Sequence, residues 1–220
     1  MKTNALLLVV VAVSNLHAQG TFQNLDFESA TPPFTPVSPN LVSITNALPG
    51  WTSYYQGNPI NGVWYNNRPL DEAGTALYDP ASPSLRPIQG NYSVLLIGST
   101  VLSPVTSAAA IGQTGQIPIT ALSLQYFATL DVSAVTFNGQ PIPTFKISDG
   151  AGYSIFGGDI SSYAGQTGEL RFTAYPSAYP FAYYTVLDNI QFSNQAVPEP
   201  GVLALSVVGG LLLGWRLRRR

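Results

Sequence analysis

The chain has 220 residues, no cysteine, one histidine and 9% charged residues, against about 25% for an average soluble domain. The one imidazole, His17, lies in a segment that we expect to be removed, which excludes His-based triads, Cys nucleophiles, His/Cys zinc sites and disulfide frameworks. The stretch between the two ends carries four basic and ten acidic residues, a net charge of −6, and the lack of a basic stripe argues against nucleic acid as a partner.

The first 20 residues have the pattern of a secretory signal peptide. Lys2 supplies the positive start, Ala5–Val13 is an unbroken apolar run, and small residues allow cleavage after Ala18 or after Gly20. The apolar run is too short to span a membrane. We therefore expect residues 1–20 to be removed and the rest of the chain to be exported. The alternative is a buried first helix.

The next segment contains a row of oxygen donors. If Phe22–Glu28 is an extended strand, Asn24, Asp26 and Glu28 share one face, because successive side chains of a strand point to opposite faces. Carboxylate and amide oxygens suit a hard cation such as Ca²⁺. The alternative leaves these acids solvated.

Aromatic residues gather between residues 51 and 65, among glycine, asparagine and proline. Flat rings that project from a loop suit stacking on sugar rings, so the cluster is a candidate carbohydrate site. The alternative is plain packing, above all for the tryptophan after Pro49-Gly50, which more often fills a core. The five candidates are Trp51, Tyr54, Tyr55, Trp64 and Tyr65.

Short strand-like segments, separated by Gly, Pro or Asn clusters, fill the rest of the body. In Gly168–Ala174 apolar and polar residues alternate, which indicates one buried and one wet face. Asn138-Gly139 is a strong signal for a type I′ hairpin. These patterns predict one all-β domain, an antiparallel β-sandwich of the jelly-roll type, over residues 21–193. Further predicted strands are Ser93–Ile97, Ser123–Ala128, Val132–Phe137 and Tyr184–Ser193.

In the last predicted strand, Asp188 has the same parity as Val186 and Ile190, so a regular strand would turn its carboxylate toward the core. A buried carboxylate needs a cation, backbone donors, or a bulge that turns it outward. Because the body has no His or Cys, an oxygen-bound Ca²⁺ is the natural metal candidate. The alternative is that Asp188 caps a turn.

After a linker at residues 194–200, the chain ends in an apolar run and a basic cluster. As a helix rising about 1.5 Å per residue, Gly201–Trp215 would reach roughly 22 Å, which is short for a hydrocarbon layer of about 30 Å. A tryptophan suits the membrane interface, and arginines beyond it favour the cytoplasmic side. We expect residues 201–220 to form a transmembrane helix that stops at Trp215, Arg216, Arg218, Arg219 and Arg220.

This tripartite end, with Pro198, Glu199 and Pro200 before the apolar run and the arginines, resembles the PEP-CTERM sorting signal of Gram-negative bacteria. The resemblance implies that these three residues are recognised by an exosortase, a membrane-embedded, cysteine transpeptidase-like enzyme that cuts near the motif. It implies a protein anchored transiently in the inner membrane and then released to the cell surface or beyond. The alternative is a plain membrane anchor with coincidental prolines.

The body also carries short landmarks that resemble galactose-binding-like jelly rolls, the fold of many carbohydrate-binding modules. In such modules a structural calcium often joins an early Glu to a late Asp, so the resemblance implies Glu28 and Asp188 as calcium ligands. The landmarks are Asn24–Glu28, Leu48–Trp51, Gly90–Val94 and Leu187–Ile190.

These observations predict a non-catalytic cell-surface or extracellular-matrix protein whose sandwich binds carbohydrate, with an exopolysaccharide or another glycan as its partner. One alternative is a secreted glycoside hydrolase, because paired carboxylates need no histidine. The neighbouring acids Asp71 and Glu72 would point to opposite faces of a strand, and the sequence has no Gly-x-Ser-x-Gly elbow. Another alternative is a purely structural or adhesive matrix protein. We expect no catalytic residues.

Overall fold

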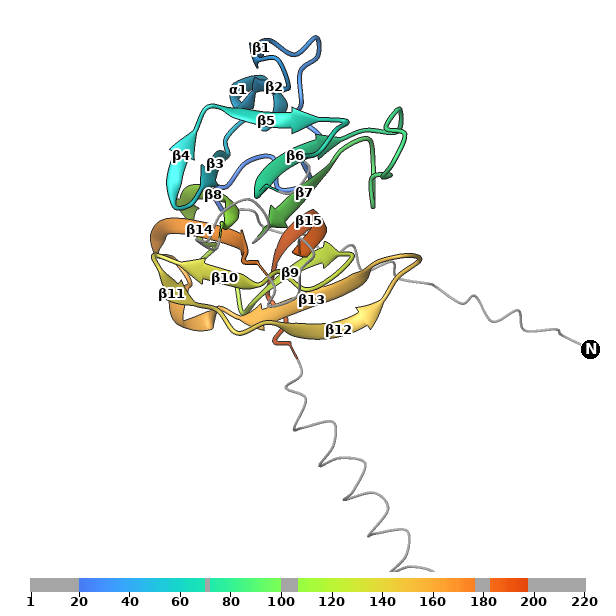
Figure 1. Ribbon diagram of the computed structural model, residues 1–220. Coiled ribbons are helices and arrows are strands. Elements are labelled where there is room, and N and C mark those ends of the chain that lie inside the picture. The colour runs from blue at the N-terminus through green and yellow to red at the C-terminus, as the bar shows by residue number, and fades with distance from the viewer. Residues whose placement is uncertain (1–19, 70–71, 100–106, 177–182, 198–220) are drawn as a thin grey trace, which may run out of the picture.

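The computed structural model describes residues 20–69, 72–99, 107–176 and 183–197, and strands dominate this part of the chain (Figure 1). Its helices are one short α-helix, α1 (Ile44–Ala47), and one 3-10 turn, η1 (Ser161–Tyr163). Neither has the length and apolar character needed to cross a membrane. Residues 1–19 of the predicted signal, the sorting motif and the predicted terminal helix lie outside the described residues.

The larger of two sheets, sheet A, consists of β1 (Pro36–Ser38), β2 (Leu41–Ser43), β5 (Gly62–Tyr65), β6 (Gly74–Tyr78), β7 (Ser93–Gly98), β9 (Ser123–Ala128), β12 (Phe145–Asp149), β13 (Ser154–Asp159) and β15 (Tyr183–Ser193). Their order across the sheet is β1-β2-β5-β6-β7-β15-β9-β13-β12, so the last described strand lies in the interior of the sheet. Neighbours pair antiparallel, except that β5 and β6 are parallel.

The smaller sheet, sheet B, consists of β3 (Thr52–Tyr55), β4 (Asn58–Ile60), β8 (Ala109–Gln116), β10 (Ala134–Phe137), β11 (Gln140–Pro141) and β14 (Thr167–Ala174). Their order is β11-β10-β14-β8-β3-β4, and every pair is antiparallel. Because β3, β8 and β14 lie side by side, residues more than 100 positions apart in sequence meet on one face.

The main hydrophobic core lies between the two sheets, which confirms the predicted β-sandwich. In β14 the side chains of Leu170 and Phe172 belong to this core, while Glu169 and Arg171 on the other face are half-buried. This alternation confirms the predicted buried and wet faces. Thr173 differs from the prediction, since it is only 8% exposed on the outward face.

Local sequence signals located five of the fifteen described strands, namely β7, β9, β10, β14 and β15. Ser123–Ala128 is β9, and β7 extends the predicted Ser93–Ile97 by one residue. Asn138 and Gly139 have φ angles of 50° and 75° and connect β10 to β11, which confirms the predicted hairpin.

A second, smaller core lies on the outer face of sheet A. Tyr78, Leu95 and Ile97 form it, whereas the residues between them in the strands face the main core. The connection from β6 to β7, residues 79–92, folds over these side chains and packs Leu85 and Ile88 against them. We call this connection the cover segment. It explains why β6 and β7 are buried along their whole length.

Residues Phe22–Glu28 do not form the predicted strand. Asn24 and Phe27 have φ angles of 51° and 60°, so the segment turns instead of running straight. Leu25 and Phe27 both reach the core. Asn24 is buried and hydrogen-bonds two backbone groups, while Asp26 is exposed. The predicted row of oxygen donors on one face is therefore wrong.

β15 contains a bulge, one of the three alternatives that the sequence left open. The register against β9 shifts between Asp188 and Gln191, and Asn189 has a φ angle of 45°. Val186 belongs to the outer core of sheet A, whereas Ile190 belongs to the main core. The common parity predicted for these residues is therefore wrong, and Asp188 points toward the cover segment, where it is 1% exposed.

Candidate functional site

The five aromatic candidates do not form one cluster. Trp51 is buried in the main core, where its ring lies 5.6 Å from that of Phe27 and its indole N–H donates to the Asn24 carbonyl at 2.9 Å. This is the packing role that the sequence offered as the alternative. Tyr55 is half-buried at the end of β3, and its hydroxyl accepts a hydrogen bond from the Gln56 amide at 3.4 Å.

Trp64 and Tyr65 lie on sheet A, away from the other candidates. Trp64 packs against the second core. The Tyr65 hydroxyl donates to the Asp79 carboxylate, and its ring lies 4.5 Å from that of Phe34 in an edge-on arrangement. Burial and the Asp79 hydrogen bond raise the pKa of Tyr65, and the same bond helps to lower the pKa of Asp79 against the opposing effect of burial. These contacts hold Asp79, the first residue of the cover segment, against β5.

Tyr54 faces outward from sheet B into a groove of about 570 Å³. This volume is within the range of roughly 300–1,000 Å³ that is typical of small-molecule sites. The groove runs over β3, β8, β14 and β10, and polar and small residues line most of it. The lining residues are Tyr54, Gln56, Gly57, Ala108, Ala109, Ala110, Thr136, Gly139, Arg171, Thr173 and Tyr175.

Tyr54, Glu169 and Arg171 form a connected group at one side of the groove. The Arg171 guanidinium carbon lies 3.9 Å from the centroid of the Tyr54 ring, which is a cation–π contact. Arg171 also pairs with the Glu169 carboxylate at 2.8 Å, and the Tyr54 hydroxyl donates to the same carboxylate at 2.5 Å. Each planar side chain is therefore held by the other two, and their positions are fixed before any ligand arrives.

Small residues on β8 make room for this group. Gly112 is paired with Arg171 on one side and Thr52 on the other, so the side chains of β14 and β3 meet above it. A Cβ atom at Gly112 would lie 2.8 Å from Glu169 Oε1 and 3.2 Å from Tyr54 Cε2. A larger residue would therefore separate the group, and glycine at this position is a requirement of the site.

The electrostatics of the group favour binding over proton transfer. Burial raises the pKa of Tyr54, and its hydrogen bond to Glu169 raises that pKa further. For Arg171, burial lowers the pKa, but the hydrogen bond and charge of Glu169 outweigh it, so the pKa stays above its ordinary value. Both groups remain protonated near neutral pH, where a general acid or base would need to exchange its proton.

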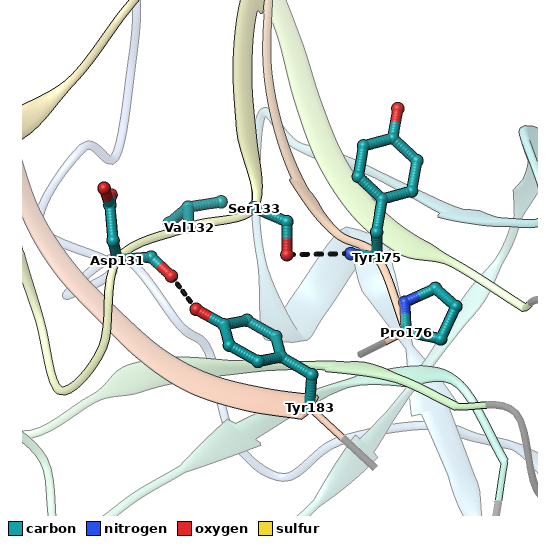
Figure 2. Close-up of a pocket in the computed structure, with 6 residues that line it drawn as sticks. All are labelled: Asp131, Val132, Ser133, Tyr175, Pro176 and Tyr183. Atoms are coloured by element: carbon teal, nitrogen blue, oxygen red, sulfur yellow. Dashed lines mark hydrogen bonds between the residues drawn. The ribbon is translucent and has the colours of Figure 1, made fainter. Parts of the chain in front are cut away.

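A second hollow of about 520 Å³ adjoins the groove at the end of β14, and Tyr175 lines both. Figure 2 shows Tyr175 after β14 and Tyr183 at the start of β15; the Tyr183 ring reaches toward Asp131 in the loop before β10, whereas the Tyr175 ring points away from that loop. The Tyr175 N–H donates to the Ser133 hydroxyl at 3.0 Å, and the Tyr183 hydroxyl donates to the Asp131 carbonyl. The first hydrogen bond fixes the Tyr175 backbone, and the second holds the Asp131 loop against β15.

Glu28 and Asp188, the predicted calcium pair, both bind the cover segment. Glu28 accepts hydrogen bonds from the backbone N–H groups of Asn91 and Tyr92, at 2.7 and 2.9 Å. Asp188 accepts from the Gln89 N–H at 2.9 Å and from the Ser93 hydroxyl at 2.6 Å. The two acids, from opposite ends of the domain, therefore hold the same turn. We call this arrangement the carboxylate latch.

The donors of the carboxylate latch do not fit a cation. N–H and O–H groups point at the two carboxylates, which is the environment of an anion, whereas Ca²⁺ takes six to eight oxygen ligands. Within the described ranges, no three Asp, Glu, His or Cys residues stand close enough together to share a metal ion. Asn24 and Asp26 are not turned toward a common point. Calcium at Glu28 and Asp188 stays a prediction that chelation can test.

Sequence reasoning found Tyr54 and the outward faces of Glu169 and Arg171, but it did not bring them together. Tyr54 and Arg171 are far apart in sequence, and their contact depends on the register of β3 and β14 against β8. Tyr175 was not singled out, although it continues the outward alternation of β14. The alternation of β14 was the one sequence signal that could have identified Tyr175.

The chain matches no protein-family model and no curated protein. Among solved structures, it is similar to a cyclase from Fischerella sp., with 15% identity, a TM-score of 0.42 and coverage of 79% of this chain and 94% of that one. The K2 cleaved adhesin domain of Lys-gingipain has 16% identity, a TM-score of 0.42 and coverage of 76% and 96%. A family 11 carbohydrate-binding module from Clostridium thermocellum, in complex with a mixed-linked tetrasaccharide, has 10% identity, a TM-score of 0.34 and coverage of 72% and 97%. At these values the comparisons assign no ligand or activity to this chain.

Proposed function

We propose that this protein is an exported, non-catalytic β-sandwich of the jelly-roll type that binds carbohydrate in the groove of sheet B. The observation that carries the proposal is the fixed group of Tyr54, Arg171 and Glu169 above Gly112. Sugar rings present apolar C–H faces to aromatic rings, and their hydroxyl pairs accept and donate hydrogen bonds with planar polar side chains. The groove supplies both kinds of surface without ordering new side chains, which limits the entropic cost of binding.

Retention on immobilised polysaccharides tests this proposal. We expect the exported form to be retarded on at least one neutral glycan, and the variant Tyr54→Ala to lose about tenfold or more in affinity. Tyr184→Ala is the matched control, because Tyr184 is 43% exposed on β15 of the other sheet. Failure of every glycan to retard the wild-type protein, or equal retardation of wild type and Tyr54→Ala, would contradict carbohydrate binding in this groove.

A glycoside hydrolase is the alternative enzyme. Hydrolysis needs two carboxyl groups on either side of the bond, and the carboxylate of the fixed group, Glu169, is occupied by Tyr54 and Arg171. We therefore infer binding without cleavage. Release of reducing sugar from the retained glycan would favour the hydrolase.

We propose, on the sequence of the two ends, that the protein is exported through its amino-terminal signal and sorted by its PEP-CTERM tail. An exosortase-type enzyme would recognise Pro198, Glu199 and Pro200 while residues 201–220 hold the chain in the inner membrane. The processed form would then reach the cell surface or the extracellular matrix. Glu199→Ala should accumulate as the longer, uncut form on a blot of the native host, and unchanged processing would refute the sorting role.

A further inference from the structure

We infer that the ligand is a neutral glycan chain that occupies both hollows at once, with Tyr175 between its sugar units. This inference rests on the proposed carbohydrate binding and deepens it. The inference excludes two other carbohydrate ligands, namely a single terminal sugar and an acidic polysaccharide.

Tyr175 is the physical link between the hollows. Its side chain is 52% exposed, and the residue lines both the groove and the second hollow. The Ser133 hydroxyl holds its backbone N–H (Figure 2). An exposed aromatic ring on a fixed backbone is a platform for the apolar face of a sugar.

The outward residues of β14 and its extension define the path of the chain. Arg171, Thr173 and Tyr175 alternate on the outward side, and all three line the groove. Four residues of strand at about 3.3 Å each separate Arg171 from Tyr175 by roughly 13 Å. The second hollow then continues with Pro176 and Tyr183. A site of this length accommodates several linked sugar rings.

The volumes agree with a chain. Each hollow alone, at about 570 and 520 Å³, falls within the range of roughly 300–1,000 Å³ that holds one small molecule. One sugar ring is much smaller than either hollow, so a ligand that fills both must carry several sugar units.

The charges favour a neutral ligand. Arg171 is the cation among the groove residues, and its charge is already paired with Glu169 at 2.8 Å. Asp131 lines the second hollow, and the body as a whole carries a net charge of −6. The described residues that line the two hollows offer a uronate-rich chain no unpaired cation, so repulsion would oppose its association.

Calorimetric titration with oligosaccharides of defined length tests the inference. The neutral probes are β-1,4-glucose, β-1,4-galactose and α-1,6-glucose oligomers of one to six units, and the acidic probe is oligogalacturonate of the same lengths. For the neutral series that binds, we expect affinity to rise about tenfold or more with length. We expect oligogalacturonate to bind more weakly than that series, and neutral binding to change little with salt.

The variant Tyr175→Ala separates the chain inference from the proposed function. It should weaken binding of the longer oligomers most and so flatten the dependence on length, whereas Tyr184→Ala should keep the full dependence. Three results would overturn the chain inference and leave carbohydrate binding standing. They are equal affinity of wild type for a single sugar and a hexamer, an unchanged length dependence in Tyr175→Ala, and tightest binding of oligogalacturonate. If wild type binds none of these probes and no immobilised glycan, the proposed function falls first.

Discussion

On sheet A the outward side chains Tyr78, Leu95 and Ile97 lie beneath the cover segment, whereas on sheet B Ala110 lines an open groove and Gly112 lies under Tyr54 and Glu169 at its side. Large apolar side chains in water are unfavourable, so the face that carries them needs a cover. Small residues expose little apolar area and leave a depression between the taller side chains of the flanking strands. The size of the outward residues, within one architecture, therefore decides which face is available to a ligand.

The two faces also differ in what fixes them. The cover segment depends on the carboxylate latch, in which each acid is bound by backbone N–H groups far from it in sequence. The groove depends on side chains of adjacent strands, which sheet pairing already positions. We therefore expect changes in the latch to alter stability and changes in the groove to alter binding.

Removal of the carboxylate latch should have the largest effect on the free energy of unfolding. In Asp188→Ala the Gln89 N–H, the Asn189 N–H and the Ser93 hydroxyl lose their acceptor under the cover segment. Since each buried unsatisfied group costs about 1–3 kcal/mol, we expect the free energy of unfolding to fall by about 3 kcal/mol or more in urea titrations.

Asp159→Ala is the control for this change, because Asp159 is exposed and accepts one hydrogen bond from the Ser161 N–H. It should cost less than about 1 kcal/mol. Glycan retention per folded molecule should be the same in both variants. Loss of binding by folded Asp188→Ala would show that the two faces are coupled.

The pH dependence of stability should reveal the latch in the wild-type protein. Burial raises the pKa of Asp188 from 3.8 to about 6, against the opposing effect of its hydrogen bonds to Ser93, Gln89 and Asn189. Because its folded-state pKa lies above the unfolded value, the contribution of Asp188 to stability is fully present below pH 4 and is lost as pH rises through 6. About two pKa units correspond to about 3 kcal/mol.

The variant Asp188→Asn isolates this contribution from those of other acids. Asp79 and Asp159 have lowered pKa values, so they contribute stability at higher pH that is lost as pH falls through their folded-state pKa values. The difference between wild type and Asp188→Asn in unfolding free energy should therefore vary between pH 4 and 7. A constant difference across this interval would exclude a titrating Asp188.

A methyl group at Gly112, beneath the fixed group, should weaken binding and leave stability nearly unchanged. In Gly112→Ala the new Cβ would push against Glu169 Oε1 at 2.8 Å and Tyr54 Cε2 at 3.2 Å, so the fixed group must separate. We expect several-fold weaker glycan retention and a melting temperature within a few degrees of wild type. Thr114→Ala, on the same face of β8, should change neither quantity. A large fall in the melting temperature without loss of binding would contradict the assignment of Gly112 to the site.

Chelation should have the smallest effect. Because N–H and O–H donors already satisfy Glu28 and Asp188, we expect EDTA to leave the melting temperature unchanged in calorimetry. A fall on chelation that excess Ca²⁺ reverses would support the calcium predicted from the sequence.

The parts of the fold that were predictable from sequence are those that short segments specify. The alternation in Gly168–Ala174 and the Asn138-Gly139 turn need no distant partner to be recognised. Phe22–Glu28 alternates equally well, yet it turns, because Phe22 is buried in the main core together with Leu25 and Phe27, although a regular strand would place it on the opposite face. Whether such a segment forms a strand or a turn therefore depends on its contacts with distant residues of the core, which its own sequence does not show.

The site was less predictable than the fold because it depends on strand register. Tyr54 was chosen for its ring, and Arg171 was placed on a wet face, but only their common neighbour β8 brings them together. The cover segment had one local signal. Val94-Leu95-Leu96-Ile97 is apolar without alternation, which is typical of a strand covered on both faces.

The position of β15 between β7 and β9 has a consequence for how the molecule is made. The two halves of sheet A stay unjoined until residues near the carboxyl end of the domain have been synthesised, and the latch lacks Asp188 until the same moment. Contacts across such a separation form slowly, since a long loop must close first. Sheet A therefore closes only after β15 has been synthesised, and the cover segment gains its second anchor at the same step.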